Sequence, residues 1–487
     1  MKILKDILYK VALTEVVGPT DIAIEGVHFD SRNVIPGSLF IAVKGGRSDG
    51  HQFIDSCIEH GAIAIVCEHI PAETKAGITY LCVKKSAEAM GIIASNFYNQ
   101  PSEKLKLVGV TGTNGKTTTA TLLFKLFREL GYKAGLISTV RNQINDREIV
   151  SAYTTPDALE INRLLAQMVA EGCSHCFMEV SSHAIVQHRI SGLKFTGAIF
   201  TNITHDHLDF HQTFDAYIKA KKKFFDDLPS SAFALINKDD PHGAVMLQNT
   251  KATKKTFALK SAADFTCRIM ENGLQGLVLT INGKEVWTKL IGAFNAYNLL
   301  GIYAAAILLG EEREEVLKII SGLGAVEGRF QYLKAPNGIT GVVDYAHTPD
   351  ALENVLNTLR EIRSANEKII TVVGCGGNRD KTKRPIMAAI ACEKSDKVIL
   401  TSDNPRSEEP EAIIADMEKG VSRSFRARAL TVTDRREAIR TACHLAQKGD
   451  IILLAGKGHE KYQEIKGVKY PFDDMEILAD NLKNLQS

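Results

Sequence analysis

The sequence predicts an α/β protein with three domains, residues 1–102, 103–327 and 328–487. Its 487 residues exceed what one hydrophobic core usually organises. Apolar runs alternate with helical patterns over residues 105–325 and again after residue 328, which is typical of parallel sheets covered by helices. We therefore expect a small N-terminal α/β domain, a central mononucleotide-binding parallel sheet with a P-loop, and a C-terminal Rossmann-like domain.

The central domain begins with a strand, a glycine-rich loop and a helix. The apolar run Leu107–Val110 predicts a buried strand, and a helical pattern starts near Thr117. Backbone N–H groups in such a loop cradle phosphate, a lysine reaches the outer phosphates and a Thr hydroxyl can bind Mg²⁺. The strict pattern has glycine where this chain has Val110. We still expect a nucleoside triphosphate to bind at Gly112, Thr113, Asn114, Gly115, Lys116, Thr117 and Thr118.

Polar residues follow several predicted strands. In an open α/β sheet, ligands bind beyond the carboxyl ends of the strands. Glu179 ends a central strand, and a carboxylate beside a phosphate loop commonly completes a Mg²⁺ shell. The other strand-end residues are Thr111 and Asn202 in the central domain, and Asp344, Arg379, Asp403 and Lys457 in the C-terminal domain.

Net charge, apolar content and cysteine content argue against a nucleic-acid-binding, membrane-spanning or secreted protein. A net charge of +2 gives no electrostatic case for a nucleic-acid or anionic-membrane partner. Met1–Lys10 predicts an amphipathic helix and not a signal peptide, and no apolar stretch approaches the length of a membrane span. Nine scattered cysteines fit a reducing compartment, so we expect a cytoplasmic protein.

Three metal or cofactor patterns are incomplete. His205, His207 and Asp209 begin a dinuclear zinc signature that Phe210 interrupts. Cys173–Cys176 is a lone Cys-x-x-Cys without a second pair, which favours core cysteines. Gly374–Arg379 begins like a dinucleotide fingerprint but has arginine in place of the third glycine. We therefore expect neither zinc nor NAD.

Four short segments carry further expectations. Asn99–Lys104 is polar and contains proline, which predicts a linker, and Gly276–Leu290 predicts a hairpin turning at Asn282-Gly283. Asp30-Ser31-Arg32 favours a plain turn. The four lysines of residues 214–225 predict a solvated basic face, although repulsion could lower one amine's pKa and allow a carbamate to form with CO₂.

Taken together, the motifs resemble the Mur ligases, the ATP-dependent amide-forming enzymes of bacterial cell-wall precursor synthesis. The resemblance covers essentially the whole chain. Its motifs are Thr111–Thr118, Thr154–Asp157, Glu179–Arg189, Asp206–Asp209, Asp344–Leu352, Gly374–Pro385, Asp403–Arg406 and Ala455–Glu460. The usual Ser-Arg before Asp206 is Thr204-His205 here, so the chain departs from the family pattern and has no arginine at that position.

The resemblance implies domains for a UDP-sugar, ATP and an incoming amino acid, in that order. It is closest to members that add the third stem-peptide residue. It implies that ATP, with Mg²⁺, activates the D-Glu γ-carboxylate of UDP-MurNAc-L-Ala-D-Glu as an acyl phosphate, which meso-2,6-diaminopimelate then attacks. The enzyme would act as a monomer on these small molecules.

The resemblance also implies roles for individual residues. Lys116, Glu179, His207 and Lys221 would be catalytic. Lys221 would be carbamylated and would ligate Mg²⁺ with Thr117, Glu179 and His207. ATP would also contact Asn295, Asn298, Arg329 and Asp344. The UDP end would contact Ser31, Gly46, Arg47 and Ser48, and the muramoyl dipeptide Thr154, Thr155, Ser181, Gln187 and Arg189. Diaminopimelate would contact Arg379, Asp403, Asn404, Pro405, Arg406, Gly456 and Glu460.

Two other functions stay open at this point. The chain could be another ligase of the superfamily, adding L-lysine or resembling folylpolyglutamate synthase, or a non-catalytic nucleotide-binding regulator. Asp403–Arg406 argues against the other ligases, because an arginine fork binds the second carboxylate of diaminopimelate and L-lysine would leave it unpaired.

Overall fold

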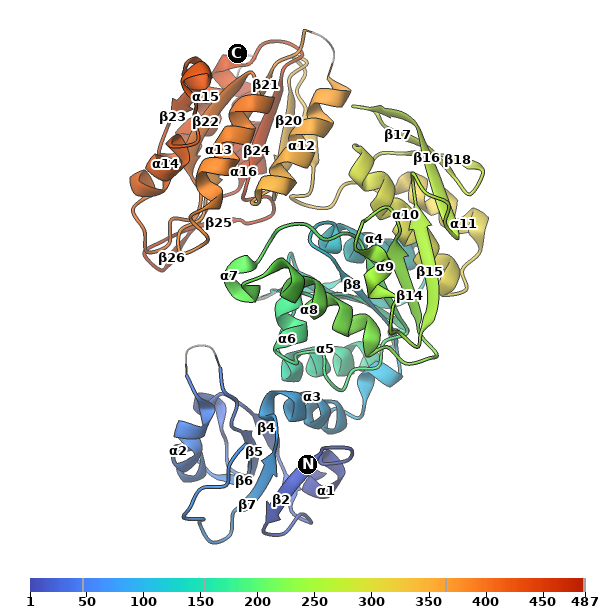
Figure 1. Ribbon diagram of the computed structural model, residues 1–487, viewed down its shortest axis with the longest axis vertical. Helices are drawn as coiled ribbons and strands as arrows, with labels where there is room; N and C mark the ends of the chain where they lie inside the picture. The colour runs from blue at the N-terminus through green and yellow to red at the C-terminus, as the bar shows by residue number, and fades with distance from the viewer. Residues whose placement is uncertain (46–47, 152–153, 364–365, 485–487) are drawn as a thin grey trace.

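Residues 1–45, 48–151, 154–363 and 366–484 are described by the computed structural model, in which three units built on separate sheets follow one another along the long axis (Figure 1). The N-terminal unit lies at one end, the C-terminal unit at the other, and the largest sheet lies between them. The predicted α/β class with three units is confirmed. Among the described helices, none is both long and apolar enough to cross a membrane.

The N-terminal unit contains a five-stranded sheet in the order β2-β7-β6-β5-β4. Its inner strands are parallel and almost wholly apolar. Such strands are typical of a sheet whose two faces are both covered by other parts of the protein. The elements are β2 (Leu13–Val17), β4 (Gly26–His28), β5 (Ser38–Ile41), β6 (Ala62–Cys67), β7 (Thr79–Val83), α2 (Ile54–Glu59) and α3 (Ser86–Phe97), with a separate pair β1 (Lys2–Ile3) and β3 (Ala23–Ile24).

The prediction of an amphipathic helix over Met1–Lys10 is wrong about the length of the helix. The helix α1 spans only Leu4–Ile7, with Leu4 and Ile7 buried. Lys2 and Ile3 instead pair with β3, and the Leu4 N–H donates to the Ile22 carbonyl at 2.8 Å. Tertiary strand pairing therefore takes the backbone groups that a longer helix would have used.

The central unit contains an eleven-stranded sheet in the order β11-β10-β9-β12-β8-β13-β14-β15-β16-β17-β18. The strands from β9 to β16 in this order are parallel, and the strands at either edge are antiparallel. The strands are β8 (Lys106–Thr111), β9 (Ala134–Ile137), β10 (Asn142–Ile144), β11 (Arg147–Ile149), β12 (His175–Glu179), β13 (Gly197–Phe200), β14 (Phe233–Asn237), β15 (Thr253–Ala258), β16 (Phe265–Gly273), β17 (Gly276–Ile281) and β18 (Lys284–Thr288).

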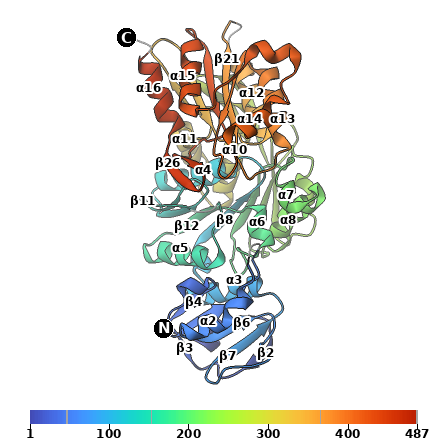
Figure 2. The same ribbon diagram turned by 90° about the vertical axis from the view of Figure 1, so that its left-hand side faces the viewer.

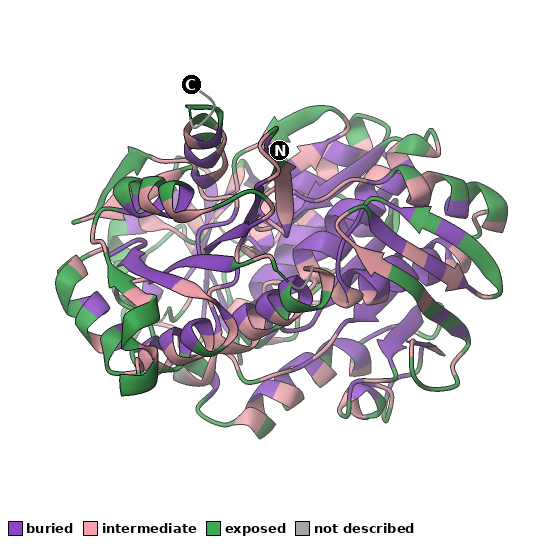
Figure 3. Ribbon diagram, turned by 90° about the horizontal axis from the view of Figure 1, so that it is seen from above, coloured by how far each residue is buried: buried purple, intermediate pink, exposed green. Residues whose placement is uncertain are grey.

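Helices cover both faces of this sheet, and two separate hydrophobic cores result. One core contains Leu123 and Leu299, and the other contains Leu164 and Phe225. Figure 3 shows the strands and inner helix faces buried, with exposed residues concentrated on the outer surfaces. The helices are α4 (Lys116–Glu129), α5 (Ala158–Ala170), α6 (Ser182–Val186), α7 (Leu208–His211), α8 (Phe214–Asp226), α9 (Gly243–Met246), α10 (Ala293–Leu308) and α11 (Arg313–Gly322).

Three smaller expectations are confirmed. β17 and β18 form the predicted hairpin, and both turn residues have positive φ, 45° at Asn282 and 83° at Gly283. Cys173 and Cys176 are buried, as expected of core cysteines. The linker holds one turn of 3-10 helix, Pro101–Glu103, beside the contact of α3 with α5 (Figure 2).

The C-terminal unit contains a six-stranded sheet in the order β19-β20-β24-β21-β22-β23, parallel except at β19. Helices pack on both faces, as in a Rossmann-like fold. The elements are β19 (Gln331–Lys334), β20 (Thr340–Asp344), β21 (Ile369–Cys375), β22 (Lys397–Ser402), β23 (Ala429–Thr431), β24 (Ile451–Ala455), α12 (Pro349–Ile362), α13 (Lys383–Lys394), α14 (Pro410–Glu418), α15 (Arg435–Leu445) and α16 (Asp474–Asn484), with a small hairpin β25 (Tyr462–Ile465) and β26 (Val468–Pro471).

Arg435 and Asp474 form an ion pair with no exposed side-chain surface, which joins α15 to α16. The guanidinium donates to both carboxylate oxygens, at 2.9 and 2.6 Å, and to the Ala455 carbonyl at 3.1 Å. Removing one partner would leave an uncompensated buried charge.

We expect Arg435→Met to lower the free energy of unfolding by about 3–5 kcal/mol, because Asp474 would remain buried and unpaired. Urea denaturation followed by circular dichroism measures this change. Arg440→Met on the same helix is the control, since its side chain is 59% exposed. Equal stability of the two variants would contradict the prediction.

Candidate functional site

The glycine loop joins β8 to α4 as the sequence predicts. Gly115 has a φ of 85° and caps α4, which begins at Lys116. A Cβ at Gly112 would lie 1.9 Å from Thr201 Oγ1, and one at Gly115 would lie 2.6 Å from Asn298 Oδ1. Both positions therefore require glycine, because the loop runs directly against neighbouring side chains.

Two lysines converge on this loop. Lys116 Nζ donates to the carbonyls of Gly112 and Thr113 at 2.9 and 2.8 Å. Lys221, in α8, is 1% exposed, and its Nζ also donates to the Gly112 carbonyl at 2.8 Å. Burial lowers the pKa of Lys116, and burial followed by the Lys116 charge puts the pKa of Lys221 well below its usual range. Lys221 is thus not on the solvated face predicted by default, and its lowered pKa favours the reactive neutral amine.

Glu179 ends the neighbouring strand β12 and is fully buried. Its Oε2 accepts a hydrogen bond from Thr117 Oγ1 at 3.0 Å, and its Oε1 accepts one from the Thr139 N–H at 2.7 Å. Arg329, from the segment before β19, donates to the same Thr117 hydroxyl at 2.9 Å. The predicted loop, carboxylate and arginine therefore meet at Thr117.

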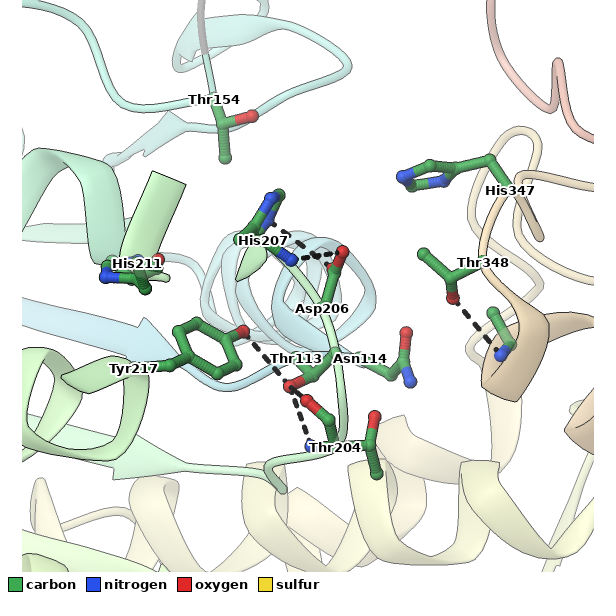
Figure 4. Close-up of polar contacts among 12 residues, drawn as sticks. Thr113, Asn114, Thr154, Thr204, Asp206, His207, His211, Tyr217, His347 and Thr348 are labelled. Carbon is green, nitrogen blue, oxygen red and sulfur yellow. Dashed lines mark hydrogen bonds and ion pairs between the residues drawn. The ribbon is translucent and has the colours of Figure 1, made fainter. Parts of the chain in front are cut away.

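His207 lies beside the loop in a left-handed conformation, with a φ of 54°. Its Nε2 lies 3.4 Å from Asp206 Oδ2, and burial lowers the pKa of His207 to about 3, so the ring is neutral and able to act as a ligand. Figure 4 shows the nearby Tyr217 pointing at Thr113, with 3.1 Å between their hydroxyl oxygens.

The expected Mg²⁺ ligands fit that ion in part. Among the described residues there is no group of three or more His, Cys, Asp or Glu side chains that could hold a metal. Thr117 Oγ1 and Glu179 Oε2, however, are neighbouring oxygens, the ligand type that Mg²⁺ prefers. A fully buried carboxylate also favours a cation beside it. Lys221 as a free amine is a hydrogen-bond donor here, so it could join this set only as a carbamate.

The C-terminal unit reaches the loop through Asp350, in the first turn of α12. Asp350 Oδ2 accepts hydrogen bonds from Asn114 Nδ2 at 2.7 Å and from Thr204 Oγ1 at 3.0 Å. Asn202, at the predicted strand end, accepts from the Asn114 N–H at 2.9 Å. Thr204 thus holds the loop and the C-terminal unit together, since its N–H also donates to Thr113 Oγ1 at 3.0 Å.

The ATP-side residues lie in two groups. Asn295 and Asn298 are buried in α10, where Asn298 Nδ2 donates to Asn295 Oδ1 at 3.0 Å. Arg329 lies 4.7 Å from the ring centre of Tyr345, and Asp344 Oδ2 accepts from the Phe330 N–H at 2.6 Å. Burial raises the pKa of Asp344 to about 6.

The residues expected to bind the muramoyl dipeptide are also close together. Thr155 Oγ1 donates to the Glu179 carbonyl at 2.9 Å and accepts from the Ser181 N–H at 3.1 Å. Arg189 donates to the Thr155 carbonyl and to Gln187 Oε1, both at 2.6 Å. Thr154 accepts from the Thr139 hydroxyl at 3.1 Å. This group therefore lies beside Glu179, since Thr155 contacts its main-chain carbonyl and Thr139, bonded to Thr154, contacts its carboxylate.

The predicted diaminopimelate contacts surround the carboxyl ends of β21, β22 and β24. Asn404 Nδ2 donates to Glu460 Oε2 at 2.7 Å, and Arg406 Nη1 donates to the Gly377 carbonyl at 2.8 Å. Arg406 Nε also lies 3.5 Å from Glu464 Oε2. Arg379 is exposed, whereas Asp403 is buried.

One cavity of about 1900 Å³ joins most of these groups. It is lined by loop residues 113–118, Glu179, His207, Lys221, Thr154, Thr155, Ser181, Arg189, Asn295, Asn298, Arg329, Asp344, Arg379, Asp403, Asn404, Arg406, Gly456 and Glu460. Gly112, Gln187 and Pro405 are not among the lining residues, and no described residue of the N-terminal unit lines the cavity.

Ser31 and Ser48, the described residues among the predicted UDP contacts, do not line the cavity. Ser31 begins a turn of 3-10 helix that Asp30 caps by accepting from the Arg32 N–H at 3.0 Å. Ser48 lies in the following loop. Gly46 and Arg47 lie outside the described residues.

Several residues at the site were not assigned from the sequence. Asp350 and Thr204 form the link to the C-terminal unit, and Asp350 lies inside a motif already singled out. His347 points into the cavity in Figure 4, and burial lowers its pKa to about 4. His459 packs against Tyr345, with 4.9 Å between ring centres. The only sequence feature that could have identified these residues is that they lie within or next to the motifs already singled out.

Family models match all three units. Residues 23–98 match the model described as the Mur ligase family catalytic domain, residues 110–307 the Mur ligase middle domain, and residues 328–458 the Mur ligase glutamate ligase domain. A UDP-N-acetylmuramoyl-L-alanyl-D-glutamate–2,6-diaminopimelate ligase of Cytophaga hutchinsonii is 60% identical over 483 residues, 99% of each chain. The Bacteroides thetaiotaomicron protein of that name is 55% identical over 478 residues, 98% of this chain and 99% of the other.

Solved structures resemble the whole chain. A structure of a UDP-N-acetylmuramoyl-L-alanyl-D-glutamate–2,6-diaminopimelate ligase has a TM-score of 0.72 and 32% identity, covering 100% of this chain and 99% of that one. The MurF ligase from Thermotoga maritima in complex with ADP has a TM-score of 0.63 at 19% identity, covering 94% and 98%. The latter likeness shows the fold alone.

We expect Gly112→Ala to weaken nucleotide binding by about tenfold or more, because the new Cβ would force the loop away from Thr201. Isothermal titration with ADP and Mg²⁺ measures the affinity. Gly322→Ala is the control, since a Cβ there meets no atom within 4 Å. Unchanged ADP affinity in the Gly112 variant would contradict the prediction.

Proposed function

This chain belongs to the Mur ligase family, and on that premise we propose that it adds meso-2,6-diaminopimelate to UDP-MurNAc-L-Ala-D-Glu. The bond forms at the D-Glu γ-carboxylate, and ATP is converted to ADP and phosphate. One observation carries the proposal: most of the residues predicted for ATP, for the muramoyl dipeptide and for diaminopimelate line a single cavity.

The three units would divide the binding work. Residues 1–102 would hold the UDP end through Ser31, Gly46, Arg47 and Ser48, residues 103–327 would hold ATP, and residues 328–487 the amino acid. The sugar-nucleotide would then extend from the N-terminal unit toward Thr154, Thr155, Ser181 and Arg189. Those side chains lie beside Glu179, so the acceptor carboxylate would arrive next to the glycine loop.

Activation of the carboxylate comes first, because a carboxylate and an amine do not condense unaided in water. The γ-phosphoryl group passes from ATP to a D-Glu γ-carboxylate oxygen, and ADP leaves. Lys116 and the loop N–H groups offset the repulsion between the two anions. Arg329, already within 2.9 Å of Thr117, adds a further positive charge at this point.

Thr117, Glu179, His207 and carbamylated Lys221 would hold Mg²⁺. When bound, this ion would stabilise charge on the phosphate oxygens. Thr117 and Glu179 present neighbouring oxygens, and the neutral His207 ring offers a nitrogen. The carbamate would supply the additional carboxylate, formed when the neutral Lys221 amine attacks CO₂ and releases a proton.

The second step forms the amide bond. The neutral amine of diaminopimelate attacks the acyl-phosphate carbon, phosphate leaves and the nitrogen loses a proton. The side chains around Asn404 and Glu460 would hold the amino acid facing that carbon. Arg406 would bind the second carboxylate, which L-lysine lacks. We further propose that the protein is a monomer and is cytoplasmic; its nine free cysteines are consistent with a reducing compartment.

We expect phosphate release to require both UDP-MurNAc-L-Ala-D-Glu and meso-diaminopimelate, with little activity when L-lysine replaces the latter. Arg406→Ala should raise KM for diaminopimelate by about tenfold or more, because a charged contact is lost. Arg423→Ala, an exposed arginine of the same unit, should leave KM unchanged. Equal rates with both amino acids, or release without an acceptor, would refute the assignment.

We expect a carbamate on Lys221 that ¹³C NMR detects after incubation with ¹³C-bicarbonate. Lys221→Ala should lose the signal together with most of kcat. Lys219→Ala should keep both, because Lys219 is a 73% exposed lysine of the same helix paired with Asp215. A wild-type spectrum without the signal would exclude the modification.

A further inference from the structure

Lys457 follows β24, in the loop that also carries Gly456 and Glu460. Its side chain has no exposed surface, and it is absent from the cavity lining. Lys457 therefore lies behind the wall formed by Asp403, Asn404 and Glu460 and cannot itself meet a ligand in the cavity. A fully buried lysine is rare in proteins unless it is paired.

The partners of Lys457 are the cavity-lining residues themselves. Its Nζ donates to Asn404 Oδ1 at 3.0 Å and to Asp403 Oδ1 at 3.3 Å, and lies 3.8 Å from Glu460 Oε2. The rings of Tyr462 and Phe472 lie on its remaining sides, each with its centre 5.8 Å from Nζ. The ammonium is thus shielded from water and directed at the cavity wall.

The contact with Lys457 fixes the orientation of the Asn404 amide. Asn404 Oδ1 accepts from Lys457 Nζ and from the Glu464 N–H at 2.9 Å, so the oxygen faces the protein interior. The amide nitrogen then points the opposite way, to Glu460 Oε2 at 2.7 Å. One buried cation therefore sets the direction of both lining side chains.

Lys457 also balances charge in this wall. Burial, and next the charge of Asp403, raise the pKa of Glu460. The Lys457 ammonium lies within 4 Å of both carboxylates, at 3.3 Å from Asp403 and 3.8 Å from Glu460, so it offsets their repulsion. Without Lys457 the carboxylates would repel each other, and one would take up a proton or turn away.

We propose that Lys457 is a positioning residue for the incoming amino acid, holding Asp403, Asn404 and Glu460 in the arrangement that binds it. This inference rests on the proposed function, since diaminopimelate is the amino acid assigned to this wall. Lys457 acts through its neighbours, so it should govern the KM for the amino acid and leave ATP binding unaffected.

The test measures kcat and the KM values for meso-diaminopimelate and ATP in full-length K457M, E460Q and the double variant. K457M should raise KM for diaminopimelate by about tenfold or more with KM for ATP unchanged, because charged hydrogen bonds are lost. The double variant should have no higher KM than the worse single variant, since both changes act on one hydrogen-bonded group.

Arg363→Met is the matched control. Arg363 pairs with Asp396 at 2.6 Å, at the opposite end of β22 from Asp403, so its loss should leave both KM values unchanged. If K457M does not fold, K457Q replaces it, because the Gln amide can still donate to Asn404 Oδ1. A smaller KM increase in the same direction is then expected.

The outcomes separate this inference from the proposed function. A wild-type enzyme that does not use diaminopimelate would overturn the function itself. A wild type that uses it, together with an unchanged diaminopimelate KM in the Lys457 variant, would overturn the role of Lys457. A parallel rise of both KM values would do the same, because it would indicate general disruption.

Discussion

The Gly112 carbonyl accepts hydrogen bonds from two lysines, and the rest of the site depends on that shared contact. Lys116 and Lys221 are thereby held side by side, so the Lys116 charge acts both on an approaching triphosphate and on the neighbouring amine. Burial, and next the Lys116 charge, lower the pKa of Lys221, which the proposed carbamylation requires. The arrangement exists because β8 ends between β12 and β13, so that α4 and α8 both face the loop.

The parts of the site that follow from local pattern were predictable. A strand, a glycine loop and a helix specify the phosphate cradle by themselves, and Gly112 and Gly115 occur where side chains would collide. Parallel strand order places Glu179 beside Val110, because their strands pair in register. The Asn282-Gly283 hairpin was predictable for the same reason, since its turn is encoded by adjacent residues.

The parts that depend on distant residues were not predictable from pattern. Arg329 and Thr117 are 212 residues apart in the chain, and Asn114 and Asp350 are 236 apart. No local periodicity specifies such pairs. The helix expected at the N-terminus is short for a related reason, because pairing of Lys2 with Ile24 overrides its amphipathic pattern. Resemblance to a family supplied Arg329 but gave no role to Asp350.

Arg329 belongs to the segment entering the C-terminal unit, yet it hydrogen-bonds the first turn of α4. The central unit by itself therefore presents an incomplete set of charges to a triphosphate. In the proposed reaction the segment that supplies Arg329 leads into the unit that binds the amino acid, so the full set of charges and the amine are brought together. This arrangement would limit wasteful hydrolysis of ATP. The phosphoryl group would become reactive only when the substrate amine is already nearby to compete with water.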